Sequence, residues 1–225
     1  MAQSNTNIDI LHGSLWRDIP LFALPVAITG ILEQLSNLID TLMIRHFSPD
    51  GGTLGMAAVG STTPIATLLI MLFVGLSLGA NVTIAHAVGA GNRDRANRCA
   101  HTAVVLALLG VVVTILMEIA SRPLMQCLSV PPEIYNDALV YMRVSLLGIP
   151  AILLFNFEAA VFRSVGVTRM PLMALAISAA LNVVLDGIFV AFLGWGAAGV
   201  ALATVLCYIV SSGFLFTRLL KADEA

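Results

Sequence analysis

Three carboxylic acids lie well inside long apolar stretches of this sequence, where ionisable side chains are rare. Glu33 and Asp40 share the first apolar stretch, and Asp186 lies in the fifth. Placing one charged side chain at the centre of a bilayer costs about 2.5–3.5 kcal/mol on insertion scales. That cost indicates that these acids bind a charged species rather than simply hold helices together.

Polar neighbours at helical spacing accompany these acids. Glu33, Ser36, Asn37 and Asp40 recur at i, i+3, i+4 and i+7, which places them on one helix face. Asn182 and Asp186 are four residues apart and share a face in the same way. For the first stripe, the alternative to a binding role is a hydrogen-bonded seam between helices, which is common in membrane bundles.

Depth in the membrane predicts which of these groups meet. At about 1.5 Å per residue, Asp40, Asp186 and Thr204 fall in the same half of the bilayer, and Asn182 stacks beside Asp186. Carboxylate, amide and hydroxyl oxygens are hard ligands suited to Na⁺. Two neighbouring carboxylates in a medium of low dielectric constant can also share a proton. We therefore predict a cation-coupling site, with Na⁺ and H⁺ both open.

Other features of the apolar stretches receive simpler interpretations. Glu118, Arg143 and Glu158 fall nearer the ends of their stretches, so we expect their side chains to reach the interface between lipid and water. Pro25 lies deeper in the first stretch, where it removes a backbone hydrogen bond. We expect a conformational kink at Pro25.

The composition fits a membrane setting. Of the 225 residues, 59% are hydrophobic and 11% charged, and the mean hydropathy is +0.96. Soluble domains have about 45–50% apolar and about 25% charged residues, so the chain is predicted to be an all-α integral membrane protein. The net charge of −2 excludes a basic surface for nucleic acid. Cys99, Cys127 and Cys207 lack metal-ligand spacing and predict no disulfide framework.

Six stretches are long enough to cross a bilayer, which takes roughly 20 apolar residues. They cover about 19–44, 55–86, 99–120, 134–157, 170–193 and 197–219. Residues 1–18 form a polar N-terminal segment without the charge pattern of a signal peptide, so the first stretch is expected to remain as a helix. The fold expected is a six-helix transmembrane bundle.

The distribution of positive charge predicts the orientation. Eight of the eleven Lys and Arg residues fall on the side of the N-terminus: Arg17, Arg93, Arg95, Arg98, Arg163, Arg169, Arg218 and Lys221. The opposite side holds Arg45 and Arg122, and Arg143 lies near the start of the fourth stretch. Because positive residues accumulate in the cytoplasm, we expect a multi-pass protein of the inner or plasma membrane with both termini cytoplasmic.

Enzymatic chemistry has no support in the sequence. His12, His46, His86 and His101 show no metal-binding spacing, and no HExxH motif is present. We expect a protein that is not an enzyme and that needs no cofactor besides a coupling ion. A passive channel or an assembly subunit is an alternative, and it would be indifferent to neutralising Asp186.

Several motifs together make the chain similar to a known family. They are Leu38–Ile44 (LIDTLMI), Leu54–Gly60 (LGMAAVG), Gly79–Asn92 (GANVTIAHAVGAGN), Phe162–Pro171 (FRSVGVTRMP), Leu181–Asp186 (LNVVLD) and Gly196–Thr204 (GAAGVALAT). In this order and spacing the chain resembles the N-terminal half of a multidrug and toxic compound extrusion (MATE) transporter, most like the DinF-like branch.

The resemblance implies a fold and a function. Family members have two six-helix lobes with the substrate cavity between them, and they export amphipathic, often cationic organic compounds in exchange for Na⁺ or H⁺. This chain would supply one lobe over residues 19–219, with residues 220–225 starting the cytoplasmic linker. We expect a truncated chain or, alternatively, a half-size protein that needs a partner lobe.

Site residues also follow from the resemblance. By motif position, the cation site would use Asp40, Asn182, Asp186 and Thr204. Tyr141 and Asn156 would line the substrate cavity, although 15 residues on one helix put them at different levels. Glu33, Ser36 and Asn37 are further cavity candidates.

A lipid-linked precursor flippase of the same superfamily is the alternative. Its cavity would need cations for phosphate groups, and Arg143 is the one candidate against several acids. Cationic cargo is therefore favoured.

Overall fold

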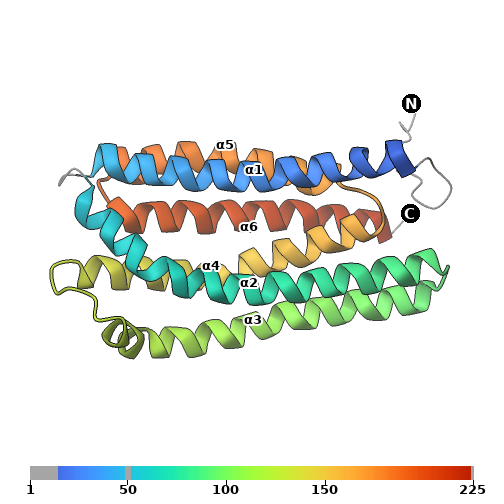
Figure 1. Ribbon diagram of the computed structural model, residues 1–225, viewed down its shortest axis with the longest axis horizontal. Coiled ribbons are helices and arrows are strands. Elements are labelled where there is room, and N and C mark those ends of the chain that lie inside the picture. Colours follow the sequence, from blue (N-terminus) through green and yellow to red (C-terminus); the bar gives the residue numbers. More distant parts are fainter. Residues whose placement is uncertain (1–14, 49–51, 224–225) are drawn as a thin grey trace.

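Six long helices, alternating in direction, make up the computed structural model, which describes residues 15–48 and 52–223 (Figure 1). The helices are α1 (Leu15–Phe47), α2 (Thr53–Gly89), α3 (Arg93–Cys127), α4 (Tyr135–Ser164), α5 (Arg169–Asp186), continued by the π-helix η1 (Gly187–Phe192), and α6 (Gly196–Asp223). Each of the six contains a segment long and apolar enough to cross a membrane. The prediction of an all-α, six-span membrane protein is confirmed.

Helix α4 lies in the middle of the bundle, packed against α2, α3 and α6, whereas α1 packs mainly along α5. Figure 1 shows α1 and α5 along one edge and α3 along the other. One apolar core joins α2, α3 and α4 around Phe73, Met142 and Leu146. A second joins α4, α5 and α6 around Phe155 and Leu215. The two cores therefore share α4, and only minor contacts join α2 directly to α1 and α6.

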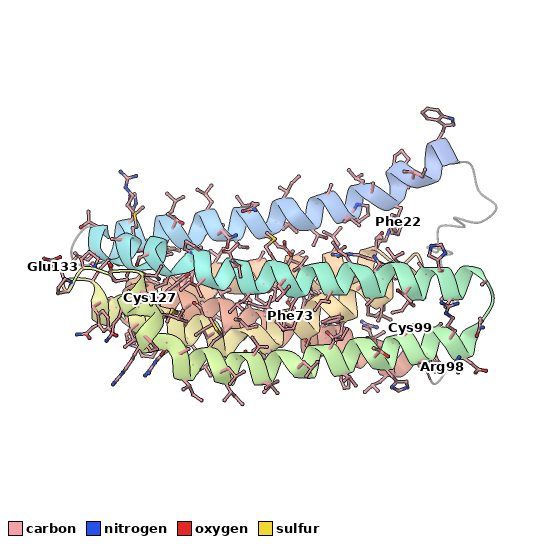
Figure 2. All side chains as sticks on the ribbon, turned by 60° about the horizontal axis from the view of Figure 1, so that its bottom comes forward. Phe22, Phe73, Arg98, Cys99, Cys127 and Glu133 are labelled. Atoms are coloured by element: carbon pink, nitrogen blue, oxygen red, sulfur yellow. The ribbon has the colours of Figure 1, made fainter. Side chains whose placement is uncertain are left out.

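The first and the last helix place their outer ends at the same end of the bundle. Helix α1 begins and α6 ends at the same end (Figure 1). Arg98 lies toward that end and Glu133 at the opposite one (Figure 2). This arrangement is the one that six consecutive crossings require. Of the predicted terminal segments, residues 1–14, 224 and 225 lie outside the described part of the chain.

Several helices extend beyond the stretches expected from hydropathy. Helix α3 runs from Arg93 to Cys127, whereas the sequence predicted 99–120. It starts earlier because the Asn92 side chain accepts a hydrogen bond of 2.9 Å from the backbone N–H of Arg95, which caps the helix. Hydropathy marks the apolar part of a helix, and charged turns outside the bilayer continue the same helix.

The fifth stretch does not remain an α-helix to its end. After Asp186 the chain continues as the π-helix η1, and the backbone N–H of Leu193 donates to the carbonyl of Ile188 at 2.9 Å. The rings of Phe189 and Trp195 stack with centroids 5.5 Å apart and hold the turn into α6. π-Helical turns occur mostly as single turns and frequently at functional sites. A hydropathy pattern cannot distinguish i→i+5 from i→i+4 bonding.

The expectation that Glu158 reaches the interface is wrong. Its side chain is 4% exposed because α6 covers this turn of α4, and the Ser212 hydroxyl donates to Oε2 at 2.9 Å. Glu118 and Arg143 pair with each other at 3.7 Å, and both remain partly exposed. Arg143 Nε also donates to Ser121 Oγ at 3.2 Å.

Candidate cation site

The candidate site is assembled from three helices. Asp40 lies near the end of α1, Asn182 and Asp186 occupy the last turns of α5, and Thr204 lies in the third turn of α6. Since α1 packs along α5 and a short turn folds α6 back onto α5, residues distant in sequence reach one level. The structure brings together the four residues that were predicted to meet.

Contacts within the cluster are short and mostly polar. The Thr204 hydroxyl donates to Asp40 Oδ2 at 3.3 Å. The Asp40 carboxyl group also lies beside the Asp186 carboxyl group and the Asn182 amide, close enough to interact with both. Asp186 is 0% and Asn182 3% exposed, and Asp40 is half-buried. Two carboxyl groups therefore face each other inside the protein.

Most oxygen atoms of the cluster have no protein partner. Asp40 Oδ1, Asn182 Oδ1 and both carboxyl oxygens of Asp186 are buried without a hydrogen bond. Buried polar atoms in native proteins are nearly always paired, and an unpaired buried charge is strongly unfavourable. A bound cation of the hard class, or a shared proton, would satisfy these oxygens. The donor set of carboxylate, amide and hydroxyl groups fits Na⁺.

Transition metals fit the site poorly. In the described part of the chain, no three residues among His, Cys, Asp and Glu are arranged to hold a metal ion. The cluster contains two carboxyl groups, one amide and one hydroxyl group, and it lacks the imidazole or thiolate ligands that zinc and copper prefer. Such a donor set would suit an alkali cation or a proton.

An apolar layer separates the cluster from one end of the bundle. Ile44, Val190, Ala197 and Val200 are buried together, and Tyr141 packs against them. The Tyr141 hydroxyl interacts with Thr63 and Ser145, and the ring lies near enough to Asp40 for an electrostatic interaction. Tyr141 is thus a neighbour of the cation cluster.

The polar residues on one face of α1, from Glu33 to Asp40, have different neighbours. Glu33 interacts electrostatically with Arg163 of α4, about two turns from Asp40. Ser36 is half-buried, and Asn37 is exposed, with its amide donating to Gln34 Oε1 at 3.5 Å. A row of residues on one helix face can still meet different neighbours, because different parts of the bundle lie beside successive turns.

Asn156 and Pro25 lie away from the cluster. The Asn156 amide donates to the Ile152 carbonyl of its own helix at 2.8 Å, and about 22 Å of α4 separates it from Tyr141 at 1.5 Å per residue. Helix α1 continues through Pro25. The Thr29 hydroxyl donates to the Pro25 carbonyl at 2.8 Å, which adds a bond next to the one that proline removes.

Two further polar residues adjoin the cluster and were not singled out from the sequence. Ser178 is 5% exposed and Cys207 is 3% exposed, and their side chains interact with each other. Ser178, Asn182 and Asp186 follow at i, i+4 and i+8, so all three belong to one buried stripe of α5. The i, i+4, i+8 spacing could have identified Ser178 from the sequence. Cys207 is only weakly polar, and no sequence pattern pointed to it.

A bundle of six apolar helices that buries a pair of carboxyl groups is typical of a domain of an ion-coupled membrane transporter. The MatE family model matches residues 25–188. The chain therefore belongs to the MatE family, whose members are transporters and not enzymes. The resemblance read from the sequence motifs is confirmed.

Curated relatives extend well beyond this chain. The Probable multidrug resistance protein NorM of Thermotoga maritima is 29% identical over 213 residues, covering 92% of this chain and 45% of the relative. The Multidrug export protein MepA of Staphylococcus saprophyticus is 23% identical over 94% of this chain and 46% of its own length. The chain spans about half the length of the curated relatives it matches.

Solved structures agree with this extent. A crystal structure of MATE in complex with MaL6 superposes with a TM-score of 0.88 and 30% identity, covering 99% of this chain and 49% of that one. An outward-facing MATE conformation gives a TM-score of 0.86 over 97% of this chain. An inward-facing conformation gives 0.75 over 88%. The six helices thus have the fold of one half of a MATE transporter, and they are more similar to the outward-facing of the latter two structures.

Proposed function

We propose that this chain is the lobe of a multidrug exporter that carries the coupling-cation site. Export of amphipathic, often cationic organic compounds would be driven by Na⁺ or H⁺ moving inward. The observation that supports this proposal best is the set of unpaired buried oxygens on Asp40, Asn182 and Asp186. Relatives of the chain are named multidrug resistance and multidrug export proteins.

The geometry suggests how ion binding would couple to movement. Asp40 is the contribution of α1 to the site, and the other three groups come from α5 and α6. Two ionised carboxyl groups repel at short distance in a medium of low dielectric constant. A Na⁺ ion or a proton between them turns repulsion into attraction and draws α1 toward α5. Release of the ion would loosen the same contact, and Pro25 offers α1 a point at which to bend.

Cationic cargo is supported by the charges available. Arg143 pairs with Glu118, so the one cation proposed for a phosphate-binding flippase already has an anionic partner. The candidate cavity residues are acidic or neutral: Glu33, Ser36, Asn37, Tyr141 and Asn156. One relative is named an FAD transporter, so family membership alone does not determine the class of cargo, and these residues carry the proposal.

A second six-helix lobe is the partner that this mechanism needs, because alternating access moves one bundle against another. The intact mass of the protein made from its own gene tests how that lobe is supplied. A product of about twice 23.7 kDa would carry both lobes on one chain. A product of 23.7 kDa would require two chains, which cross-linking would detect.

Ion-coupled export is tested with that protein in proteoliposomes loaded with a fluorescent organic cation. We expect efflux to require an opposing Na⁺ or proton gradient, and the two gradients applied separately identify the ion. Efflux without any gradient would instead support the passive channel. Retention of the dye under both gradients would contradict cation export.

A further inference from the structure

Glu158 is a buried acid outside the cation site. It lies in α4, two turns before the helix ends, and its side chain is 4% exposed. The Ser212 hydroxyl of α6 donates to Oε2 at 2.9 Å. Oε1 is buried without a hydrogen-bond partner. One neutral hydroxyl group is thus the polar partner that the structure gives this carboxyl group.

Charged groups on the surrounding helices do not compensate for it. Arg163 on α4 interacts with Glu33 of α1. Tyr208 lies one turn before Ser212 on α6, and its ring packs against Phe155. The charged or titratable side chains described toward this end of α2, α3, α5 and α6 are His86, Asp94, Arg95, Arg98, Cys99, His101, Arg169 and Arg218. Among the residues whose side chains the structure describes, no ion pair involves Glu158.

Glu158 is separate from the Asp40–Asp186 cluster. Its partner Ser212 follows Thr204 by eight residues on α6, which is about 12 Å along the helix at 1.5 Å per residue. Helix α6 runs from Thr204 toward the end of the bundle where α1 begins. Glu158 therefore lies closer to that end than the cluster does.

A shallow groove leads from the surface to Ser212. It lies between α4 and α6 and has a volume of about 250 Å³. Its lining residues are Ala151, Leu154, Ile209, Ser212, Gly213 and Phe216. Gly213 has open space where a side chain would stand. Water entering this groove would meet the hydroxyl group that contacts Glu158.

We propose that Glu158 is a second proton-binding group of this lobe, which holds its proton as a neutral carboxylic acid at neutral pH and exchanges it through the groove between α4 and α6. A carboxyl group buried without a cation favours its neutral form. The added proton resides on one carboxyl oxygen, and the other accepts from Ser212. The inference deepens the proposed function by adding a proton site to the exporter, but its test does not require transport.

Difference infrared spectroscopy on the protein made from its own gene tests the proposal. We expect the carbonyl stretch of a protonated carboxyl group at neutral pH, lost in Glu158→Gln and shifted by D₂O. Glu133→Gln is the matched control, because Glu133 is exposed and should be ionised. Gly213→Leu fills the groove and should slow the D₂O shift without removing the band.

Different results would contradict the protonated Glu158, the groove as its route, and the proposed function. A wild-type spectrum unchanged by Glu158→Gln would overturn the proposal, since Glu158 would then be ionised. If Glu158→Gln fails to insert, Ser212→Ala decides: loss of its donor must shift the band, and an unshifted band overturns the proposal. An exchange rate unaffected by Gly213→Leu would overturn the groove as the route. Failed dye efflux with the Glu158 band present would count against the proposed function alone.

Discussion

The Thr204 hydroxyl donates a hydrogen bond of 3.3 Å to Asp40 Oδ2, joining residues 164 positions apart in the chain. This contact ties the first helix of the lobe to the last at the level of the buried Asp186. Helix α1 packs mainly along α5 and contacts α6 much less, and the Asp40–Thr204 hydrogen bond is one of the contacts that link α1 to α6. A change in the charge of the cluster is therefore well placed to move α1.

Neutralising Asp186 should abolish coupling. In Asp186→Asn we expect the apparent affinity for the coupling ion to fall about 10- to 150-fold, as loss of a charged hydrogen-bonding group of about 1.5–3 kcal/mol implies. Drug resistance of expressing cells should be lost, whereas membrane insertion stays intact because an amide is easier to bury than a charge. Asp137→Asn, at an exposed acid in the first turn of α4, is the control. Unaltered efflux in Asp186→Asn would reject the ion site.

Asp40→Asn should remove the dependence of substrate release on Na⁺ or pH. In the proposed site Asp40 is the ligand that α1 contributes, so its loss should uncouple the site from that helix even where an ion still binds Asp186. The measurement is the rate of dye release against ion concentration. A dependence that persists with normal slope would place coupling elsewhere, for instance in the second lobe.

The Thr204 hydroxyl should make a smaller contribution. In Thr204→Val we expect the affinity for the coupling ion to fall about fivefold, since a neutral hydrogen bond contributes about 1 kcal/mol. Thr204→Ser keeps the hydroxyl group and should stay close to the wild type. Ion titration of dye efflux measures both. Equal affinities for the Val and Ser variants would show that Thr204 does not assist binding.

The contact between α4 and α6 depends on Gly148. A β-carbon at this position would overlap a methyl group of Val205, and β-branched valine has little freedom to move aside. We expect Gly148→Ala to destabilise the protein by about 1–3 kcal/mol, as overpacking does, and Val205→Ala to restore part of that loss. Thermal unfolding in detergent is the measurement.

Gly75→Ala is the matched control for that substitution, because nothing lies within 4 Å of the added carbon. It should leave the melting temperature unchanged or slightly raised. Equal melting temperatures of Gly148→Ala and Gly75→Ala would contradict the close packing of α4 against α6 at Gly148.

Two native cysteines test the orientation. Cys127 is exposed at the end of α3, and Cys99 is half-buried near its start. With both chain ends cytoplasmic, a membrane-impermeant maleimide added to intact cells should label Cys127 and leave Cys99 unlabelled. Cys127→Ser should abolish the labelling. In inside-out vesicles the maleimide reaches only the cytoplasmic face, so the expected orientation leaves Cys127 unlabelled. Labelling of Cys127 in inside-out vesicles but not in intact cells would show the opposite orientation.

Much of this protein could be predicted from residue order alone. An unbroken apolar stretch has to become a membrane helix, since lipid offers no other partner for backbone polar groups. The number of spans and the Asn182–Asp186 stripe follow from such local rules. The same-level placement of Asp40 and Thr204 required only counting along helices.

Other features depended on which helix covers which. Glu158 has the spacing of a residue near a helix end, yet α6 packs over it and supplies Ser212. Glu33 and Asp40 share a helix face, yet one lies near Arg163 and the other near Asp186. The π-helix after Asp186 has no hydropathy signature. Sequence periodicity determined which side chains share a face, and tertiary packing decided which of them lose water and which partners they gain, because burial depends on neighbours from distant parts of the chain.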